Sequence, residues 1–443
     1  MSVASPGLEG PAATRDRLSR EHLRVGIASF FGNAVEQYDF FGYGTGAALA
    51  FPAVFYPNVS PSFATFLAFA TFAVGYFFRP LGSVVFGHLG DRIGRKRMLI
   101  VTLLMMGIGS TIIGLIPSYA SIGVAAPIIL LAMRAVQGFA IGGEGAGAVL
   151  MAVEHAPPRL RGLLGAFPQI GVASGIVVAN LLFLLISVLV THEQFLAWGW
   201  RVPFLFSVVL VGIGTYIRLR VAESPVFEQM EKQETKAAVP IVTLFRTRWK
   251  PVVQLVVALF YPNTQGYVFI FILAYGTRVL HLPQPMLLAF SVIANLIEVP
   301  VTLYSGHISD RIGRKRMVMI GLAVGAVVGA VFFPLVNTRE PALVFLAMLA
   351  MRLGIAAMYG PIYTMFSEQF DTNVRFSGIA VGNAISGLLG AQIPAVAALI
   401  MTGGGGGTQS MSIFLFCASA LAFVNVWAMK VGKRVDLATL KSE

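Results

Sequence analysis

The sequence predicts an all-α membrane protein whose twelve transmembrane helices form two pseudo-symmetric six-helix bundles. Hydrophobic residues make up 56% of the 443 residues and charged residues only 12%, well below the charged share of soluble proteins. The octapeptide DRIGRKRM occurs at Asp91–Met98 and at Asp310–Met317, and each copy follows a Gly-His pair, at Gly87 and, 219 residues later, at Gly306. A repeat at half the chain length, lying between apolar segments, is typical of duplicated membrane proteins.

Twelve apolar segments each approach the ~20 residues that a helix needs to cross a bilayer. The expected spans are 25–51, 63–89, 98–116, 124–153, 163–190, 200–220, 251–277, 284–308, 317–336, 342–367, 376–401 and 411–430. The repeat extends into them, because Ala132-Met133-Arg134 in the fourth span recurs as Ala350-Met351-Arg352 in the tenth. The chain is therefore expected to contain a parallel duplication of six helices.

Lysine and arginine indicate the orientation of the spans. Of the 32 such residues, 26 fall in the termini and in the loops that follow even-numbered spans. Because cytoplasmic loops carry this excess, both termini are expected in the cytoplasm. The expected parts are a cytoplasmic tail 1–24, a bundle 25–220, a cytoplasmic linker 221–250, a bundle 251–430 and a cytoplasmic tail 431–443.

Several classes of function lack the residues that they need. The single cysteine, Cys417, excludes a disulfide framework within the chain, and the six histidines lack metal-ligand spacing. No Walker A sequence is present, so ATP-driven transport is not expected. The basic clusters are short and explained by topology, which argues against nucleic-acid binding. We therefore expect no enzyme, no metal and no cofactor.

Ionisable residues within the spans carry the functional argument, because a charge at membrane depth is costly unless it has a partner or a function. Glu36 and Asp39 lie one turn apart in the first span, and Arg134 lies at a similar depth in the fourth. These opposite charges are expected to neutralise each other, so that a substrate carboxylate or a proton competes for the pairing. The alternative is a permanent ion pair that only holds two helices together. Two acids and one base leave a proton to be placed, which favours a functional site.

Two spans carry polar stripes. In the fourth span, Arg134, Gln137 and Glu144 share one face, and Glu144 is equally explained by proton exit or by a structural role. A stripe in the eighth span either lines a cavity or hydrogen-bonds a neighbouring helix, and its glutamate favours the cavity. This stripe comprises Ser291, Asn295, Glu298, Thr302 and Ser305.

The chain resembles the major facilitator superfamily, and within it the metabolite:proton symporter branch. The motifs that carry the resemblance are Gly87-x-x-x-Asp91-Arg92-x-Gly94-Arg95-Lys96 with its second copy, Arg79-Pro80-Leu81-Gly82, Arg134-x-x-Gln137-Gly138, Gly142-Gly143-Glu144, Glu223-Ser224-Pro225 and Glu36-x-Tyr38-Asp39-Phe40. The branch usually has Trp where this chain has Gln37 and Gly145. Both positions lie near the expected cavity, so no single relative predicts the substrate.

The resemblance implies that spans one, four, seven and ten line the cavity and that the arginine of the fourth span serves proton coupling. The expected proton-coupling residues are Asp39, Glu36, Arg134 and Glu144. The expected substrate-binding residues are Arg134, Gln137, Tyr38, Gln169, Tyr261, Asn263, Gln265, Asn295, Glu298, Arg352, Tyr359 and Tyr363. Anchoring at the membrane interface explains any single tyrosine of this set about as well as substrate binding does. Hydrogen bonding between helices explains Gln169 as well as substrate binding does.

The repeated loops are expected to form a cytoplasmic gate. Asp91 and Asp310 lie at helix ends, where an acid can accept hydrogen bonds from a neighbouring helix N-terminus. In the resembled superfamily such loops hold one bundle to the other in the outward-open state. The expected gate residues are Gly87, Asp91, Arg92, Arg95, Asp310, Arg311 and Arg314.

The expected function is a proton-coupled symporter that imports a small organic acid across the plasma (bacterial inner) membrane by alternating access, with Asp39 slightly ahead of Glu36 as the proton carrier. The arginines within the spans, Arg79, Arg134 and Arg352, favour an anion. The alternatives are a proton symporter for a zwitterionic osmolyte such as proline or betaine, and a drug or metabolite:proton antiporter. Expected partners are the small-molecule substrate, protons and the lipid bilayer, without nucleic acid, and the chain is expected to be a monomer.

Overall fold

A computed structural model describes residues 20–93, 95–142, 150, 152–153, 156–157, 159–220, 244, 246, 248–370, 372–402 and 407–429. The first half forms α1 (Arg20–Leu49), α3 (Pro61–Ile93), α4 (Arg95–Leu115), α6 (Ala125–Ile141), α8 (Arg161–Gly165), α9 (Phe167–Leu189) and α11 (Arg201–Arg220). The second half forms α14 (Trp249–Arg278), α15 (Gln284–Ile312), α16 (Arg314–Asn337), α17 (Pro341–Ser367), α18 (Thr372–Ala391), α19 (Ile393–Thr402) and α20 (Gly407–Ala428). The connections hold α2 (Phe51–Phe55), α5 (Tyr119–Ile122), α10 (His192–Gln194) and the π-helical η1 (Phe195–Gly199).

Each of the twelve expected spans coincides with a helix or a broken helix in the described part of the chain. Eight described helices are long and apolar enough to cross a membrane, and a pair bent by 44°, His192–Gly199 with Arg201–Tyr216, brings the number to nine. The apolar parts of α4 and α6 are shorter. The breaks before α9 and α19 coincide with Pro168 and Pro394, since proline lacks the N–H that would continue the helix.

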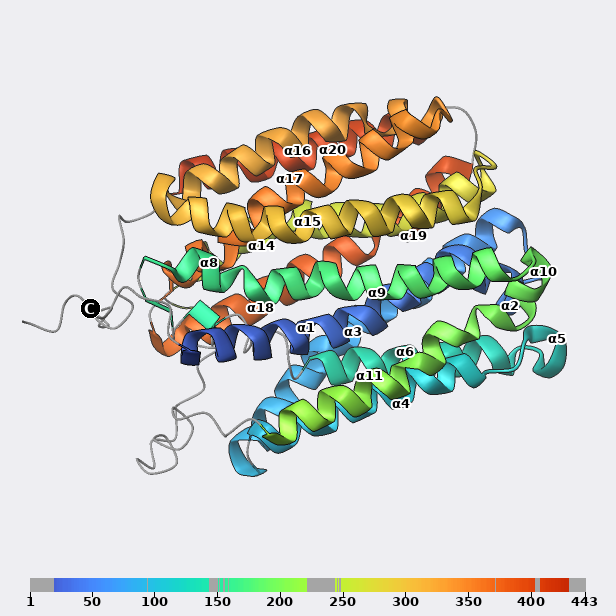
Figure 1. Cartoon of the computed structure of the whole chain (residues 1–443), viewed down its shortest axis with the longest axis horizontal. Helices are drawn as coiled ribbons and strands as arrows, with labels where there is room; N and C mark the ends of the chain where they lie inside the picture. Colours follow the sequence, from blue (N-terminus) through green and yellow to red (C-terminus); the bar gives the residue numbers. More distant parts are fainter. Residues whose placement is uncertain are drawn as a thin grey trace, which may run out of the picture.

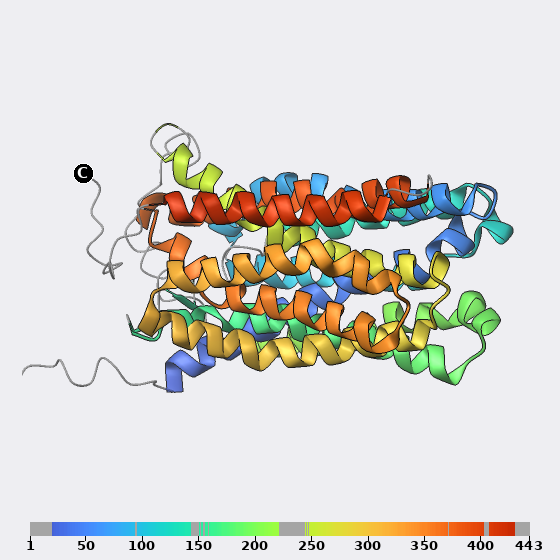
Figure 2. The same cartoon turned by 90° about the horizontal axis from the view of Figure 1, so that it is seen from above.

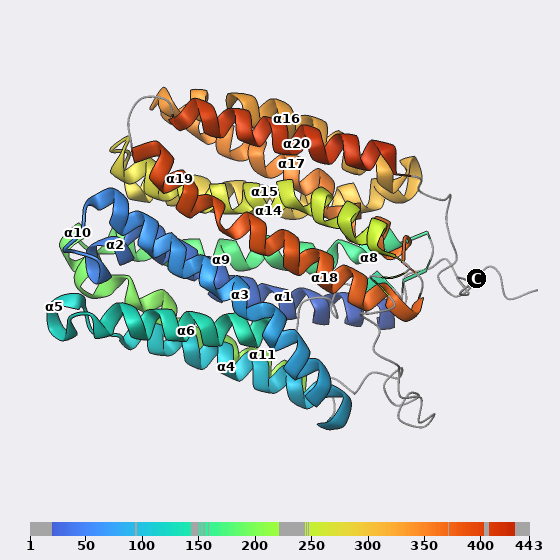
Figure 3. The same cartoon turned by 180° about the vertical axis from the view of Figure 1, so that it is seen from behind.

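The two halves of the chain form two adjacent bundles. In Figure 1 the first half, blue to green, lies below the second half, yellow to red, and the long helices run roughly side by side. Between the bundles α9 packs along α15, α3 packs against α18 and α19, and α1 packs against α14; Figure 3 shows α3 and α18 from the other side. Because the second and eighth spans correspond in the repeat, as do the fifth and eleventh, this interface is itself pseudo-symmetric.

The beginning of α1 and the last turn of α20 lie at the same end of the molecule, on the left in Figures 1 and 2. The short helices α2, α5 and α10 lie at the opposite end. An even number of crossings produces this arrangement. The expected linker and tails fall mostly outside the described residues, so their cytoplasmic location stays a prediction.

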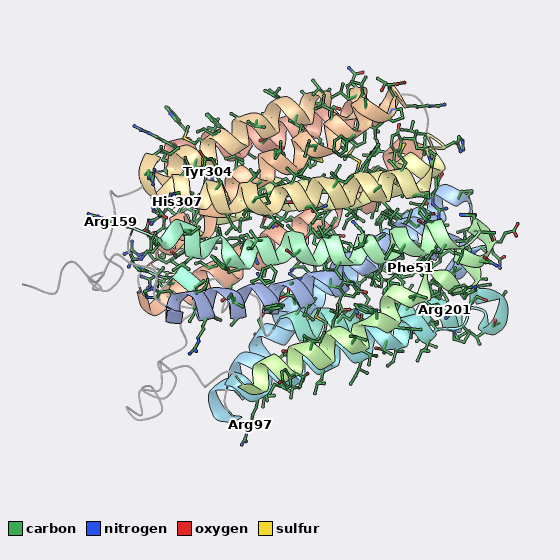
Figure 4. The ribbon with its side chains drawn as sticks, in the orientation of Figure 1. Phe51, Arg97, Arg159, Arg201, Tyr304 and His307 are labelled. Carbon is green, nitrogen blue, oxygen red and sulfur yellow. The ribbon has the colours of Figure 1, made fainter. Side chains whose placement is uncertain are left out.

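An aromatic cluster closes the end that carries α2. Trp200 is fully buried and packs edge-on against Phe51 and Phe204. Next to it, Arg201 Nη1 donates hydrogen bonds to the carbonyl oxygens of Gly114 at 3.0 Å and Ile116 at 2.6 Å. A cation at the last carbonyls of α4 satisfies acceptors that have no partner within that helix. Phe51 and Arg201 are labelled at this end in Figure 4, and Arg97, Arg159 and His307 toward the other.

The topology can be tested by cysteine labelling in a Cys417→Ser background. Arg97→Cys and Arg311→Cys follow the second and eighth spans, so both should react with an impermeant maleimide in inverted membrane vesicles only. Glu193→Cys follows the fifth span and should react only from the other side. Labelling of Arg97→Cys and Arg311→Cys from opposite sides would contradict the parallel repeat.

Candidate functional site

A cavity of about 80 Å³ lies between the two bundles. From the first half it is lined by Gln37, Phe41, Tyr76, Arg79, Gln169 and Val172, and from the second half by Asn263, Gly266, Tyr267, Tyr359, Tyr363, Asn383 and Gly387. Sites for small organic ligands usually measure roughly 300–1,000 Å³, so this cavity is contracted. A larger hollow of about 550 Å³ lies between α16 and α20, but no ionisable residue lines it. The central cavity is therefore the candidate site.

Arg79 is the one cation among the described residues that line this cavity. It forms an ion pair with Glu36 of α1, with 3.8 Å between Arg79 Nη2 and Glu36 Oε1. The guanidinium also lies 4.2 Å from the ring centre of Tyr76. Gln37, which lines the cavity at one of the departures from the resembled branch, donates from Nε2 to Glu36 Oε1 at 3.3 Å. The sequence indicated Arg79 as one of three arginines within the spans that favour an anion, and as part of a motif that carries the family resemblance, but not as a residue of the cavity wall.

Arg134 is fully buried behind the cavity and does not pair with Glu36, which corrects the Glu36 part of the expected pairing between the first and fourth spans, whereas Asp39 interacts with it electrostatically. Its Nε donates to the carbonyl oxygen of Phe72 at 3.1 Å, and its Nη1 donates to Gln137 Oε1 at 3.3 Å. Arg134 and Glu36 do not meet because α3 packs against both α1 and α6. Arg79 of α3 forms the ion pair with Glu36 in its place. A Cβ on Gly138 of α6 would collide with α3, so this close approach requires glycine.

Three aromatic rings surround the Arg134 guanidinium, and no carboxylate of the described residues lies in salt-bridge contact with it. The guanidinium carbon lies 4.6 Å from the ring centre of Phe40, 4.4 Å from that of Tyr43 and 4.8 Å from that of Phe72. Its Nη2 donates no hydrogen bond within the described part of the chain. Cation–π contacts stabilise a desolvated guanidinium without neutralising it. Arg134 thus keeps its positive charge next to Asp39, with which it interacts electrostatically.

Asp39 belongs to the same polar cluster and does not line the cavity. Ser207 of α11 donates to Asp39 Oδ1 at 2.5 Å. Gln137 Nε2 donates to Ser110 Oγ of α4 at 2.7 Å, so the cluster joins four helices of the first bundle. Glu144, the remaining expected coupling residue, lies outside the described residues.

The polar stripe of the eighth span lies against neighbouring helices and not along the cavity. Arg352 Nε of α17 donates to Glu298 Oε2 at 2.6 Å, and Arg352 Nη2 donates to Asn295 Oδ1 at 2.5 Å. Asn180 Nδ2 of α9 donates to Ser291 Oγ at 2.8 Å, which links the two bundles. Hydrogen bonds therefore account for Ser291, Asn295 and Glu298, and Ser305 donates to the Ala356 carbonyl of α17 at 2.7 Å, whereas the buried Thr302 hydroxyl makes no hydrogen bond within the described residues.

Three further expected substrate ligands hold helices together. The Tyr38 hydroxyl donates to the Pro203 carbonyl at 2.5 Å, the Tyr261 hydroxyl donates to Gly325 at 2.8 Å, and Gln265 Nε2 donates to Met351 at 2.8 Å. Four expected ligands do line the cavity, namely Gln169, Asn263, Tyr359 and Tyr363. Tyr267 also lines it and hydrogen-bonds Tyr76 across the bundles, and Tyr76 is a lining residue that the sequence did not single out.

One end of the interface is closed by the second copy of the repeated loop. Asp310 accepts hydrogen bonds from the backbone N–H groups of Gly162, at 2.9 Å, and Leu163, at 3.2 Å, at the start of α8. Arg314 donates to Asp310 at 3.3 Å and also pairs with Glu368. Gly87 lies near the end of α3, the side chains of Asp91, Arg92 and Arg95 are not among the described ones, and Arg311 is exposed.

The other end is closed by different contacts. Arg278 of α14 donates to the carbonyl oxygens of Ala48 and Leu49 at the end of α1, both at 3.4 Å. Phe69 and Phe271 pack together, with 6.0 Å between their ring centres. The bundles thus meet on both sides of the contracted cavity. Within the described residues, no group of three His, Cys, Asp or Glu side chains could hold a metal ion.

Two pseudo-symmetric helical bundles around one central cavity, with separate contacts at its two ends, define a multi-pass membrane transporter. The family model of the Major Facilitator Superfamily matches residues 30–394, and the chain belongs to that superfamily.

Curated relatives cover nearly the whole chain. The inner membrane metabolite transport protein YhjE of Escherichia coli (strain K12) is 39% identical over 414 residues, covering 90% of this chain and 92% of the relative. The shikimate transporter of the same strain is 36% identical over 416 residues, covering 93% and 95%. A proline/betaine transporter of Salmonella typhimurium is 33% identical over 392 residues, covering 86% and 78%. These proteins are named as transporters, and this chain is a transporter as well, not an enzyme.

Solved structures support the same fold. A crystal structure of a D-xylose-proton symporter superposes with a TM-score of 0.73 at 18% identity, covering 95% of this chain and 99% of that one. At this identity the likeness concerns the fold alone.

Asp310→Asn should slow transport with little change in substrate affinity, because Asp310 joins the bundles and does not line the cavity. Hydrogen bonds to a charged group contribute about 1.5–3 kcal/mol, so we expect a roughly tenfold or greater loss in rate. The expected counterpart Asp91→Asn should behave alike, and exposed Arg316→Gln is the control. Abolished binding with an unchanged exchange rate would contradict the gate.

The Glu298–Arg352 pair allows a test of structural against substrate-binding roles. Arg352→Met leaves a buried carboxylate without its counter-charge and should destabilise the detergent-solubilised protein by about 3–5 kcal/mol. The double variant with Glu298→Leu should recover most of that stability and retain substrate affinity. Recovery of stability with loss of affinity would instead assign the pair to the substrate.

Proposed function

We propose that this transporter is a proton-coupled symporter that imports a small organic acid across the plasma (bacterial inner) membrane by alternating access. The observation that carries the proposal is the Arg79–Glu36 pair at the wall of the cavity. One group is permanently cationic and the other can exchange a proton, so an anion and a proton can both be bound there.

An organic anion fits the charge of the site. Little water screens Arg79 in the contracted cavity, so a carboxylate would be attracted strongly. Arg134, buried without a contacting carboxylate among the described residues, adds positive potential behind the cavity. The relative named shikimate transporter supports an organic acid as the substrate class.

Proton coupling is supported by the acids on α1. Asp39 lies beside Arg134 and accepts from Ser207, and Glu36 lies beside Arg79. Binding of an anion at the arginines changes the electrostatic environment of both acids, so protonation and substrate binding favour each other. A symporter requires this reciprocal dependence.

A second candidate is a proton symporter for a zwitterion, and the tyrosines favour it. Tyr76, Tyr267, Tyr359 and Tyr363 line the same cavity as Arg79. Aromatic rings recognise quaternary ammonium groups, and a nearby carboxylate such as Glu36 adds to the attraction. The relatives named as proline/betaine transporters support this alternative.

Uptake into proteoliposomes tests both candidates. Under an imposed inward proton gradient, labelled shikimate should accumulate, and an uncoupler should abolish the accumulation. Labelled glycine betaine should accumulate instead if the zwitterion proposal is correct. Accumulation of either compound without dependence on the proton gradient would contradict proton symport.

Arg134→Ala should abolish accumulation, because it removes the charge beside Asp39 and leaves a cavity among Phe40, Tyr43 and Phe72. Asp39→Asn should retain counterflow while gradient-driven accumulation falls roughly tenfold or more, if Asp39 carries the coupled proton. Exposed Arg339→Gln is the control. Full gradient-driven accumulation in Asp39→Asn would leave Glu36 as the proton carrier, and full accumulation in Glu36→Gln as well would place the coupling elsewhere, with Glu144 or Glu298 as the next candidates.

A further inference from the structure

We propose that Arg79 is the carboxylate-binding subsite for a compact monocarboxylate and that Glu36 is the acid which the substrate displaces and which takes up the coupled proton. This inference rests on the proposed function and specifies its binding site. It assigns the exchange to the Arg79–Glu36 pair and leaves Asp39 and Arg134 as a supporting cluster behind it.

The Arg79–Glu36 pair is loose. The two side chains are 3.8 Å apart and keep 13% and 6% of their surface exposed, whereas Arg352 and Glu298 are 2.6 Å apart and 2% exposed each. Charge-assisted hydrogen bonds between such groups usually measure about 2.7–2.9 Å. Arg79 Nε is buried and donates no hydrogen bond within the described part of the chain. The guanidinium therefore has donors available for a second carboxylate.

Arg79 does not depend on Glu36 for its position. Its guanidinium carbon lies 4.2 Å from the ring centre of Tyr76 and 5.2 Å from that of Phe40. These aromatic faces hold the planar cation from the side and leave its edge for hydrogen bonding. Glu36 can thus be displaced while the arginine remains in place.

The rest of the lining limits the substrate to one carboxylate. The other polar groups at the cavity are neutral, and neither the Gln169 amide nor the Tyr359 hydroxyl makes a hydrogen bond to the described protein. They suit hydroxyl or carbonyl groups of a ligand. A second carboxylate would face these groups without a counter-charge, which is costly in a site with little water. The chemical class is therefore a hydroxylated or keto monocarboxylate.

Displacement of Glu36 explains the uptake of a proton. The charged and titratable groups that face Glu36 include Arg79 from α3 and Tyr363 from α17. Once the substrate carboxylate occupies Arg79, two carboxylates face one guanidinium, so Glu36 gains affinity for a proton and binds one from the outer solution. When the substrate leaves, Arg79 pairs with Glu36 again and the proton passes to the cytoplasm. One proton is thus carried per carboxylate.

Gly266 provides the room opposite this subsite. It lines the cavity on α14, and a Cβ built there meets no atom within 4 Å. A larger side chain at this position would therefore begin in open space and extend into the cavity. Gly212 of α11 is a matched control, because a Cβ there also meets nothing within 4 Å and the residue does not line the cavity.

Isothermal titration in two buffers with different ionisation enthalpies tests the exchange on the purified full-length protein. The probes are shikimate, quinate, lactate and pyruvate, their methyl esters, and the dicarboxylate succinate. We expect a monocarboxylate to bind with uptake of about one proton and its ester to bind roughly tenfold or more weakly. Binding of succinate alone, or of no monocarboxylate, would overturn the proposed substrate class.

Variants of single residues show which side chain binds the carboxylate and which takes up the proton. Arg79→Gln should abolish the preference for acid over ester, and Glu36→Gln should keep binding but take up no proton. The exposed controls Arg339→Gln and Glu340→Gln should take up the proton as the wild type does. Asp39→Asn is not a control but decides between the two acids of α1, because a proton carried by Glu36 is still taken up in this variant. Gly266→Leu should weaken binding roughly tenfold or more, and Gly212→Leu should not.

Three results would overturn the assignment: proton uptake retained in Glu36→Gln, proton uptake lost in Asp39→Asn, or acid preference retained in Arg79→Gln. These measurements need no membrane gradient. Binding and proton uptake can occur as expected while proteoliposomes show no gradient-driven accumulation. In that case the Arg79–Glu36 subsite is confirmed and the proposed proton symport is wrong.

Discussion

A charged side chain inside a membrane-spanning bundle is stable only when a counter-charge, a hydrogen-bonding partner or an aromatic ring replaces the water that it has lost. The two bundles meet this demand differently. Glu298 and Arg352 are in close contact at 2.6 Å, whereas Glu36 and Arg79 remain 3.8 Å apart beside the cavity. The close pair joins α15 to α17, and the loose pair leaves charge available to a ligand. The arrangement of helices places Arg79 of the loose pair at the wall of the cavity, whereas neither Glu298 nor Arg352 lines it.

The contacts at the two ends of the interface differ in kind, and this difference suits alternating opening. Asp310 receives backbone hydrogen bonds from Gly162 and Leu163, whereas Arg278 donates two longer bonds to carbonyl groups at the end of α1. Each set can break while the other holds, because each involves separate residues on separate helices. Under the proposed alternating access, a contracted cavity with both sets of contacts formed would lie between the two open states.

The sequence predicted the elements better than their contacts. Apolar length located the spans, and the repeat indicated that Asp310 would meet a helix N-terminus, as its bonds to α8 show. The sequence expected both Glu36 and Asp39 to face Arg134, and the Glu36 part was wrong, because residue spacing gives depth along a helix but not the neighbour at that depth. Likewise, periodicity could not separate Gln265, which bonds another helix, from Asn263, which lines the cavity, since helices inside a bundle are buried on several faces. The functional roles of these residues stay predictions.

The duplication itself explains why the two bundles have unlike charge pairs. Arg134 and Arg352 occupy equivalent positions, but their neighbours on the second and eighth spans, Arg79 and Glu298, carry opposite charges. In the second bundle the acid therefore meets the arginine of α17 directly. In the first bundle Arg134 donates a hydrogen bond to the Phe72 carbonyl and contacts aromatic rings such as Tyr43. Arg79 forms its ion pair with Glu36 on α1. One difference in charge between equivalent positions thus produces both a buried cation behind the cavity and a second cation facing it. Under the proposed function, the anion would be held at Arg79 on one side of a pseudo-symmetric fold, while the other side supplies neutral hydrogen-bonding groups.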